Sequence, residues 1–372
     1  MIRAVLVDDE PPARARMRQL LEAAGGVTVV GEAGSAVEAA VLIRDTRPDL
    51  LFLDVDMPEV KGTALAASLP EPRPFIVFAT AYEQYALDAI AVDATDYLLK
   101  PVSRARLAAT LDRVRGRLAR QSDLERDVAA GSAVQAQMWL GTLPAIPGFD
   151  CAAASLPARG VGGDFYDAFP IGPEGPAIAG PLWGLLLGDA SGKGVAAGLV
   201  ASAVQARVHT AARLANLAPA ALVSAVDRDV YASIEGLRYA TAIYATLATA
   251  TRRVSLVNAG HPAALVFDPS SASVSRVDAT GPALGLVESA VFTAHEFTLS
   301  SGGLLVAYTD GVSEARDGGD TEFGDGRVEA LVRASHHLPA RDLCAALVNA
   351  VRGHRGARQD QDDATVLVVK AV

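Results

Sequence analysis

An apolar run that ends on an aspartate in a glycine-rich turn constrains this chain more than any other feature. The run is Leu-Trp-Gly-Leu-Leu-Leu at 182–187, and Gly-Asp-Ala-Ser-Gly-Lys-Gly follows it at 188–194. Short apolar runs of this kind are typical of buried strands, and a helical pattern begins near Val195. A buried strand that delivers a carboxylate to a glycine turn before a helix indicates a site, so Asp189 is the first candidate site residue.

Two simpler interpretations of this turn compete with a site. A Walker-type phosphate loop needs four residues between its first glycine and Gly-Lys, then Ser or Thr, whereas Gly188 and Gly192 enclose Asp-Ala-Ser and Gly194 follows Lys193. This spacing argues against a nucleotide cradle. The turn could also be a helix N-cap made by Asp189 or Ser191. Aspartates at the ends of other predicted strands argue against that alternative.

Length and composition exclude several classes of protein. A chain of 372 residues is long enough for two or three domains, and a net charge of −10 gives nucleic acid no overall electrostatic reason to bind. Cys151 and Cys344 are far apart, which predicts neither a disulfide framework nor a zinc site and suits a reducing cytoplasm. The longest apolar window, about 176–188, is shorter than the roughly 20 residues of a membrane span. We therefore expect a cytoplasmic protein with no nucleic-acid or membrane partner.

Residues 1–102 alternate short apolar runs with helix-length segments. The runs are 4–7, 27–30, 50–53, 75–78 and 97–99. This pattern predicts an α/β domain with a five-stranded, doubly wound parallel sheet, whose ligand site lies at the carboxyl ends of the strands. The side chains at those ends are Asp8 and Asp9 after the first run, Asp54 after the third, Thr80 after the fourth and Lys100 after the fifth.

These polar residues predict a Mg²⁺ site beside a phosphoacceptor. Carboxylates that converge on one rim repel one another by roughly 4 kcal/mol per close pair at an effective dielectric of 20, and a divalent cation removes that cost. Oxygen ligands can come from Asp9, Asp54 and the carbonyl of Asp56, with Asp8 acting through water. Asp54 can then accept a phosphoryl group as nucleophile. Lys100 would pair with the phosphoryl oxygens and Thr80 would donate a hydrogen bond to them.

The same region resembles response-regulator receiver domains. The motifs are Leu-Val-Asp-Asp-Glu (6–10), Leu-Asp-Val-Asp-Met-Pro (53–58), Ala-Thr-Ala (79–81) and Asp-Tyr-Leu-Leu-Lys-Pro (96–101). The resemblance implies that a sensor histidine kinase phosphorylates Asp54 and that Thr80 and Tyr97 report the change. Residues 78–86 are similar to receivers that precede LytTR DNA-binding domains, although no such domain follows here.

The residues after Pro101 predict a helical connector. Leu107, Leu111, Val114 and Leu118 form a narrow apolar stripe that Ser103 could cap. The stripe favours a short coiled coil and hence a homodimer, while packing on the receiver alone is the alternative. Gly116 and Gly131 predict a joint before a second helical segment at 133–140. The expected domains are a receiver at 1–120, a connector at 121–140 and an α+β domain at 141–372.

Residues 148–372 predict a β-rich α+β sandwich with a second acidic site. The expected strands are 151–155, 182–188, 240–246, 254–258, 264–267, 304–308 and 365–369, and the long helices are 195–214 and 219–234. Acids at their ends or in turns are Asp164, Asp189, Asp310, Asp362 and Asp363. Four or more carboxylates on one rim suggest two divalent cations, which can lower the pKa of a shared water toward about 7 and support hydrolysis of a phosphate ester without a Cys, Ser or His nucleophile.

This half is similar to the metal-dependent PPM-type Ser/Thr protein phosphatases of the SpoIIE-like branch. The motifs are Val-Gly-Gly-Asp-Phe-Tyr-Asp (161–167), Gly-Asp-Ala-Ser-Gly-Lys-Gly (188–194), Asn-Ala-Gly-His-Pro (258–262), Tyr-Thr-Asp-Gly-Val-Ser-Glu (308–314) and Asp-Asp-Ala-Thr (362–365). The resemblance implies two Mn²⁺ or Mg²⁺ ions, bridged by Asp189 and bound also by the Ala190 carbonyl, Asp164 and Asp310. It gives Asp362 as the remaining ligand, with the adjacent Asp363 as the alternative. Ser191 stands where the eukaryotic branch has His, so no general acid is assigned.

Together the two resemblances imply a response regulator that controls a protein phosphatase. The implied substrate is a phosphorylated STAS-domain anti-sigma factor antagonist, so dephosphorylation would release a sigma factor by partner switching. One alternative is a pseudophosphatase that recruits or sequesters a partner according to receiver phosphorylation. A DNA-binding regulator is the other, which the acidic composition disfavours.

Overall fold

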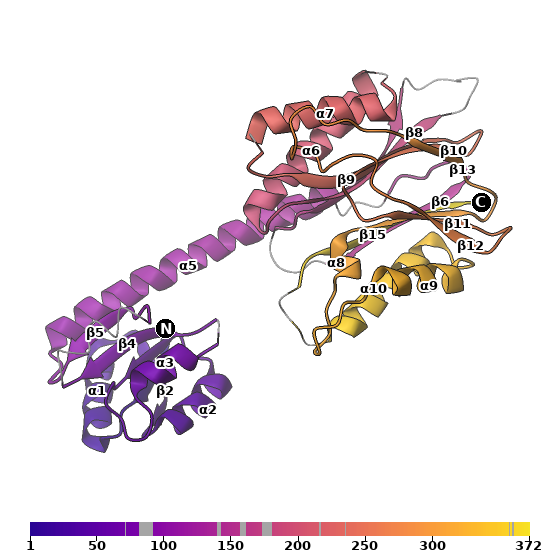
Figure 1. Ribbon diagram of the computed structural model, residues 1–372. Helices are drawn as coiled ribbons and strands as arrows, with labels where there is room; N and C mark the ends of the chain where they lie inside the picture. Colours follow the sequence, from indigo (N-terminus) through magenta and orange to yellow (C-terminus); the bar gives the residue numbers. More distant parts are fainter. Residues whose placement is uncertain are drawn as a thin grey trace. The chain divides into compact units, whose positions relative to one another are not determined.

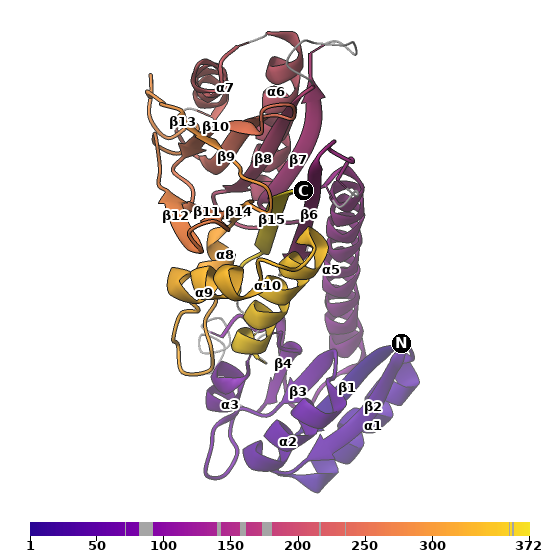
Figure 2. The ribbon, with the colours of Figure 1, turned by 90° about the vertical axis from the view of Figure 1, so that its right-hand side faces the viewer.

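A computed structural model describes residues 1–70, 72–81, 92–139, 143–156, 161–172, 181–215, 217–234, 236–356, 358 and 361–372. The chain forms two compact units, Met1–Glu125 and Arg126–Val372, which are drawn as ribbons in Figures 1 and 2. Within the described residues, none of the helices has both the length and the apolar character that crossing a membrane requires.

The first unit is built on a five-stranded parallel sheet with the order β2-β1-β3-β4-β5. Its strands are β1 (Ile2–Val7), β2 (Val27–Ala33), β3 (Leu50–Leu53), β4 (Phe75–Thr80) and β5 (Asp96–Leu99). The strand order reverses between β1 and β3, which is where a doubly wound sheet binds its ligand. Asp8 and Asp54 follow these two strands directly. The predicted α/β sheet is confirmed.

Helices cover both faces of this sheet (Figure 1). On one face, α2 (Ala36–Thr46) and α3 (Gly62–Ser68) bury Ile43 and Leu65 against the strands. On the other, α1 (Pro11–Ala24) and the first turns of α5 (Arg104–Trp139) bury Leu21 and Leu111. Both faces of the strands are thus covered, which explains why they are continuous apolar runs.

Helix α5 is a single element of 36 residues. Ser103 caps it as predicted, because its Oγ accepts a hydrogen bond from the Arg106 N–H at 3.2 Å. The predicted joint is wrong, since Gly116 and Gly131 both lie inside the helix. A cost of about 1 kcal/mol per glycine is too small to interrupt a long run of good helix formers.

The second unit contains two five-stranded antiparallel sheets, β13-β10-β9-β8-β7 and β12-β11-β14-β15-β6. The strands are β6 (Phe149–Leu156), β7 (Asp164–Ile171), β8 (Leu182–Ala190), β9 (Ala240–Ala248), β10 (Arg253–Ala259), β11 (Ala264–Asp268), β12 (Ser273–Val277), β13 (His295–Thr298), β14 (Leu304–Tyr308) and β15 (Ala364–Ala371).

These sheets form the inner layers of a four-layer sandwich, which Figures 1 and 2 show from two sides. α6 (Val195–Leu214) and α7 (Pro219–Ile234) pack on the first sheet, and α9 (Asp325–Ser335) and α10 (Ala340–Arg355) pack on the second. A third apolar cluster, which includes Leu187 and Val369, fills the space between the sheets. The predicted α+β sandwich is therefore confirmed.

Several elements of this unit were not predicted from the sequence. β7 contains Asp167 and Pro170 and lies at a sheet edge, so its apolar pattern is weak. α10 is different, because Leu343, Leu347 and Val351 recur at helical spacing and are fully buried. That periodicity was a usable signal for a helix.

Two candidate acidic sites

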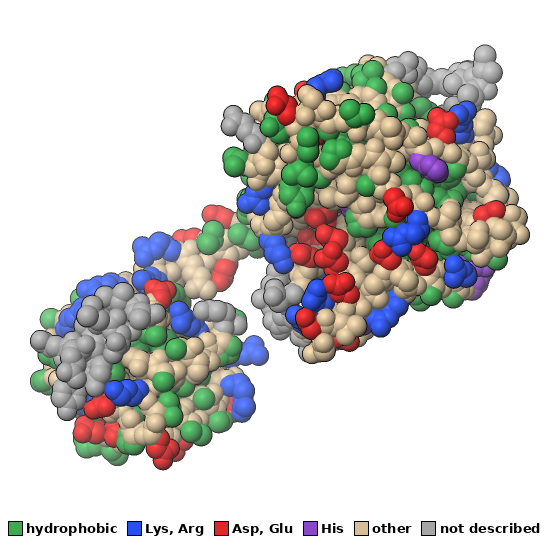
Figure 3. All heavy atoms as spheres, in the orientation of Figure 1, with side chains coloured by type: hydrophobic (Ala, Val, Ile, Leu, Met, Phe, Trp, Pro, Cys, Tyr) green, Lys and Arg blue, Asp and Glu red, His purple; other side chains and the backbone are tan. Residues whose placement is uncertain are grey.

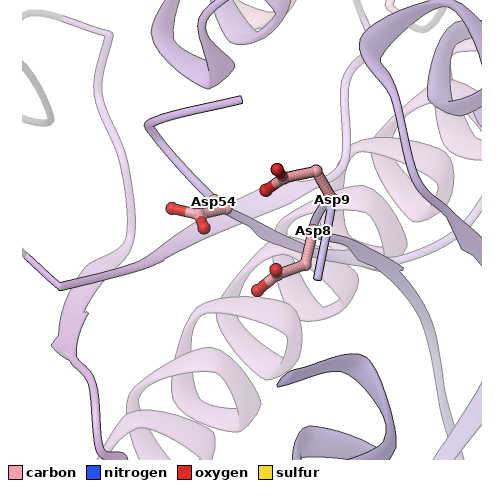
Figure 4. Close-up of side chains that lie close together, drawn as sticks. All are labelled: Asp8, Asp9 and Asp54. Atoms are coloured by element: carbon pink, nitrogen blue, oxygen red, sulfur yellow. The ribbon is translucent and has the colours of Figure 1, made fainter. Parts of the chain in front are cut away.

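The first acidic site lies at the carboxyl edge of the parallel sheet. Asp8 and Asp9 follow β1, Asp54 follows β3, and their three carboxylates project to the same side (Figure 4). Oxygen atoms from the three side chains all lie within 4.8 Å of one another. This spacing and this all-oxygen donor set suit a hard divalent cation such as Mg²⁺.

The side-chain ammonium of Lys100 forms ion pairs with two carboxylates of this cluster. Its Nζ lies 2.6 Å from Oδ2 of Asp8 and 2.6 Å from Oδ2 of Asp54. Burial raises the pKa of Asp54, and the hydrogen bond and charge of Lys100 oppose that rise without cancelling it. Burial would lower the pKa of Lys100, but the two carboxylates raise it overall, so the ammonium stays charged. Lys100 is therefore held beside the Asp54 carboxylate in the charged form that pairing with a phosphoryl group requires.

The other predicted residues of this rim lie close in the fold. The Asp56 N–H donates to Oδ1 of Asp54 at 3.3 Å, and the Lys100 N–H donates to the carbonyl of Thr80 at 2.8 Å. Thr80 is fully buried and Tyr97 is half-buried on β5. Their roles in phosphorylation, and the use of the Asp56 carbonyl as a ligand, stay predictions. Tyr82–Ala86, part of the LytTR-like segment, lie outside the described residues.

The second acidic site begins where β7 and β8 pair. Their antiparallel register sets Asp164 opposite Asp189, and the Ala190 N–H donates to the Gly163 carbonyl at 3.1 Å. A Cβ on residue 163 would stand 2.7 Å from Oδ1 of Asp189 and 2.8 Å from the Ala190 carbonyl oxygen. Only glycine fits there. The missing side chain of Gly163 leaves room for the two predicted ligands, Asp189 and the Ala190 carbonyl, against the backbone of residue 163.

The second sheet brings further acids to the same place. Asp310 follows β14 after one intervening residue, Thr309. The Thr309 N–H donates to the Thr365 carbonyl at 3.0 Å, and Asp363 lies two residues before Thr365. Oδ2 of Asp363 accepts a hydrogen bond from the Gly163 N–H at 3.2 Å. Acids from both sheets of the sandwich therefore lie at one rim, where Gly163 and Asp363 are in contact although they are 200 residues apart in the chain.

Asp362 lies on the solvent side of this rim. Its Oδ1 lies 3.1 Å from Nζ of Lys193, and 57% of its side chain is exposed. A polar cavity of about 180 Å³ opens here, lined by Lys193, Asp310, Asp362 and Arg355 among others. In Figure 3, red acidic side chains gather in a hollow of this unit with blue basic ones beside them. Asp362 and Asp363 thus differ in setting, one open and paired with a lysine, the other bound to a backbone N–H.

The electrostatics of the second site favour bound cations. Burial, followed by the charges of Asp164, Asp310, Asp362 and Asp363, raises the pKa of Asp189 to about 9. Burial also raises the pKa of Asp164 to about 7, against the hydrogen bonds that it accepts. Divalent cations would lower these pKa values and keep the carboxylates ionised. The chemistry of these residues, carboxylate and carbonyl oxygens, therefore suits hard divalent cations.

Two threonines that the sequence analysis missed fix the orientation of Asp164. Thr309 and Thr365 donate to Oδ2 of Asp164 from their hydroxyls at 2.8 and 2.6 Å. Both are almost fully buried, and each is a near neighbour of another candidate ligand, Asp310 or Asp363. The two buried hydroxyls hold the Asp164 carboxylate in one orientation, as groups that support a metal ligand do. Both threonines lie inside sequence motifs that contain the candidate acids, and this position was the signal that could have identified them.

Gln135 on α5 is a third residue that the sequence did not single out. Its Nε2 donates to the Gly162 carbonyl at 2.7 Å, and its Oε1 accepts from the Gly162 N–H at 2.8 Å. A Cβ on Gly198 of α6 would stand 2.9 Å from the same Nε2. The Gln135 amide thus satisfies both the N–H and the carbonyl of Gly162, which lies two residues before Asp164.

His261 of the Asn-Ala-Gly-His-Pro motif has a structural role. Its N–H donates to Oδ1 of Asn258 at 2.8 Å, and its Nδ1 lies 2.8 Å from the hydroxyl of Thr241. Burial lowers its pKa to about 3, so the ring is neutral at physiological pH. It holds a turn and the neighbouring strand β9.

Removing metal ions should make the stability of this unit fall as pH rises. The pKa values of Asp164 and Asp189 in the folded state, about 7 and about 9, lie above the value near 4 of an unfolded chain. The folded state therefore binds more protons between these limits, and the free energy of unfolding decreases with pH. In EDTA we expect the Tm to fall between pH 5.5 and 8.5, and Mn²⁺ to restore it. A Tm in EDTA that rises over this range, or an Asp189→Asn variant with the same slope, would contradict this account.

Comparisons with known proteins identify both units. The receiver-domain family model, "Response regulator receiver domain", matches residues 4–112, and the model "Stage II sporulation protein E (SpoIIE)" matches residues 180–372. The transcriptional regulatory protein BtsR of Salmonella typhi is 46% identical over 122 residues, which are 32% of this chain and 51% of the relative. BtsR of Escherichia coli is 45% identical over 122 residues, again 32% and 51%. The chain spans about half the length of these relatives.

Solved structures match the second unit. The SiaA-PP2C domain of Pseudomonas aeruginosa superposes with a TM-score of 0.56 at 20% identity, over 68% of this chain and 98% of that one. The RsbU and RsbW domains of Rv1364c from Mycobacterium tuberculosis give a TM-score of 0.51 at 26% identity, over 62% and 63%. These matches support the PP2C fold and, with the family models, lead to one conclusion. The chain belongs to the SpoIIE family of phosphatases and joins a response-regulator receiver domain to a PP2C-type phosphatase domain.

Proposed function

We propose that this protein is a response regulator whose output removes phosphate from phosphoserine or phosphothreonine on a partner protein. The proposed substrate is a phosphorylated STAS-domain anti-sigma factor antagonist, as family resemblance implies. We also propose the functional limits 1–120, 121–140 and 141–372, and a homodimer formed through the connector. A sensor histidine kinase is the proposed phosphodonor to Asp54.

One observation supports the proposed chemistry above the others. Carboxylates from two sheets, of which Asp164 is buried, surround Asp189, whose pKa rises to about 9 through its own burial and its acidic neighbours. We propose that Asp164, Asp189, the Ala190 carbonyl, Asp310 and either Asp362 or Asp363 hold two Mn²⁺ or Mg²⁺ ions. When bound, such ions supply an activated water and offset charge on the phosphate ester.

The chain's own residues orient this site. Thr309 and Thr365 fix the Asp164 carboxylate, and Gly163 lets the β7–β8 edge approach Asp189 closely. Lys193 is the basic side chain nearest the exposed carboxylate of Asp362, where it can meet an incoming phosphate. Every carboxylate that the SpoIIE-like resemblance requires is present, which favours an enzyme over a pseudophosphatase.

A phosphate-release assay tests the proposal. Wild-type protein with Mn²⁺ should release phosphate from a phosphoserine STAS-domain protein, and the rate should change when beryllofluoride occupies Asp54 of the receiver. Equal rates in the two receiver states would remove the regulatory part of the proposal, whereas no release from any phosphoprotein would remove the enzymatic part.

Gln135 offers a physical route from the connector to the active site. It lies on α5, the helix that begins in the receiver unit, and it binds both polar groups of Gly162. Two hydrogen bonds of about 0.5–1.5 kcal/mol each are enough to favour one position of this backbone over another. A shift of α5 would therefore alter how Asp164 is presented to the cations.

Replacing Gln135 with alanine should lower the Mn²⁺-dependent rate about tenfold and shrink the difference between the two receiver states. A tenfold loss corresponds to about 1.4 kcal/mol, within what two such bonds supply. Val134→Ala is the matched control, because Val134 is the preceding residue of α5 and is exposed. A Gln135→Ala enzyme that keeps both the full rate and the full response would show that this contact does not couple the units.

A further inference from the structure

Four large apolar side chains are exposed together on the phosphatase unit. They are Leu237 (84% exposed), Tyr239 (40%), Leu286 (45%) and Val287 (47%), and we call them the rim patch. They lie on two segments that Ala240 and Leu284 join as an antiparallel bridge, with hydrogen bonds of 2.9 and 2.8 Å in the two directions. The pairing is confined to this one bridge, and the Leu286 N–H donates to the Ala283 carbonyl at 3.3 Å in a turn that follows it. All four side chains of the rim patch belong to residues within three positions of the bridge.

The rim patch begins next to the acidic turn of the active site. The Ser191 N–H donates to the Tyr239 carbonyl at 2.8 Å, and the Tyr239 N–H donates to Oγ of Ser191 at 3.0 Å. The Arg238 guanidinium donates to the Ser191 carbonyl at 3.0 Å. Because paired strands lie about 5 Å apart, Tyr239 lies within roughly 10 Å of the Asp189 backbone.

A buried carboxylate, that of Asp227, fixes the backbone of one segment of the rim patch. Oδ1 of Asp227 on α7 accepts a hydrogen bond from the Gly285 N–H at 2.9 Å, and Asp227 is fully buried. This anchor fixes the backbone directly before Leu286 and Val287 while their side chains face solvent. Exposed apolar side chains on two bridged segments, one of them with an anchored backbone, are typical of a preformed protein-binding site.

We propose that the rim patch is the docking surface for the phosphoprotein substrate, which would place an apolar surface on it beside the phosphorylated residue. This inference depends on the proposed phosphatase function. A folded partner that brings a phosphoserine to Asp189 must cover about 800 Å² of this domain, and the rim patch lies within that reach. The chain has a net charge of −10, so a phosphorylated partner gains little from long-range attraction and needs apolar contacts for affinity.

The test compares a small and a large substrate in a Leu237→Ser, Leu286→Ser double variant of the full chain. With Mn²⁺, hydrolysis of p-nitrophenyl phosphate should stay within twofold of wild type, because neither leucine lies among the carboxylates. For a phosphoserine STAS-domain protein, kcat/KM should fall at least tenfold, mainly through KM. Leu214→Ser is the matched control, since Leu214 is 81% exposed at the opposite end of α6 and should change neither rate.

The outcomes separate this inference from the proposed function. An unchanged kcat/KM on the phosphoprotein overturns the docking role, and so does an equal fall on both substrates, which would indicate a damaged fold. A variant that keeps the phosphoprotein rate but loses self-association in sedimentation would show that a second copy of the chain occupies the patch. Wild-type protein that cleaves neither substrate overturns the proposed function itself, and one that cleaves only p-nitrophenyl phosphate overturns both proposals.

Discussion

Replacing Asp189 with asparagine should lower Mn²⁺-dependent phosphate release about a thousandfold. Asp189 is the carboxylate whose pKa is affected by all four of the other acids at the rim. An asparagine has nearly the same shape but no charge, so it would offset less of the positive charge of the proposed cations. The measurement is the initial rate of phosphate release at saturating Mn²⁺, with Mn²⁺ affinity followed by calorimetry.

The matched control for this substitution is Asp167→Asn. Asp167 lies on β7 of the same sheet, but it pairs with His209 of α6 at 2.9 Å and takes no part in the acidic rim. It should keep most of the wild-type rate. If Asp189→Asn turned over as fast as Asp167→Asn, the cation site would have to lie elsewhere.

Replacing Asp54 with asparagine should abolish stable phosphorylation of the receiver. Wild-type protein incubated with labelled acetyl phosphate and Mg²⁺ should incorporate up to one phosphoryl group per chain. The variant should incorporate none, because the amide is not a nucleophile and Lys100 would lose one of its two carboxylate partners. Acid-stable and hydroxylamine-sensitive label would be counted on gels.

Asp45→Asn is the control for the receiver experiment. Asp45 lies on α2 and has an exposed side chain paired with the neighbouring Arg44. This variant should be labelled like the wild type. Label that persists in Asp54→Asn would place the phosphoacceptor at another residue, with Asp8 and Asp9 the next to test.

The sequence predicted the parallel sheet because its strands contain short apolar runs, and three of the five runs are followed directly by a charged residue. The same rule places Asp8, Asp9 and Asp54 at one edge of the sheet, where the structure has them. Asp189 was found for the same reason, since β8 is mostly buried and Asp189 is its penultimate residue. These predictions rest on local patterns combined with one topological rule.

Other features could not be read from local patterns. The hydrogen bonds from Thr309 and Thr365 to Asp164 cross between the two sheets, and the contact of Gln135 joins α5 to a turn 27 residues away. The joint predicted at Gly116 and Gly131 was wrong because tertiary contacts and neighbouring helix formers outweigh the propensity of single glycines. Contacts of this kind depend on the packing of distant segments.

The most direct test of the central claim is phosphate release from a phosphoserine protein across a Mn²⁺ titration. We predict that release is absent in EDTA, rises with Mn²⁺ to saturation, and is lost in Asp189→Asn at every concentration. Release that continues at full rate in EDTA, or that never begins at saturating Mn²⁺ in either receiver state, would contradict the assignment of this acidic rim as a metal-dependent phosphatase site.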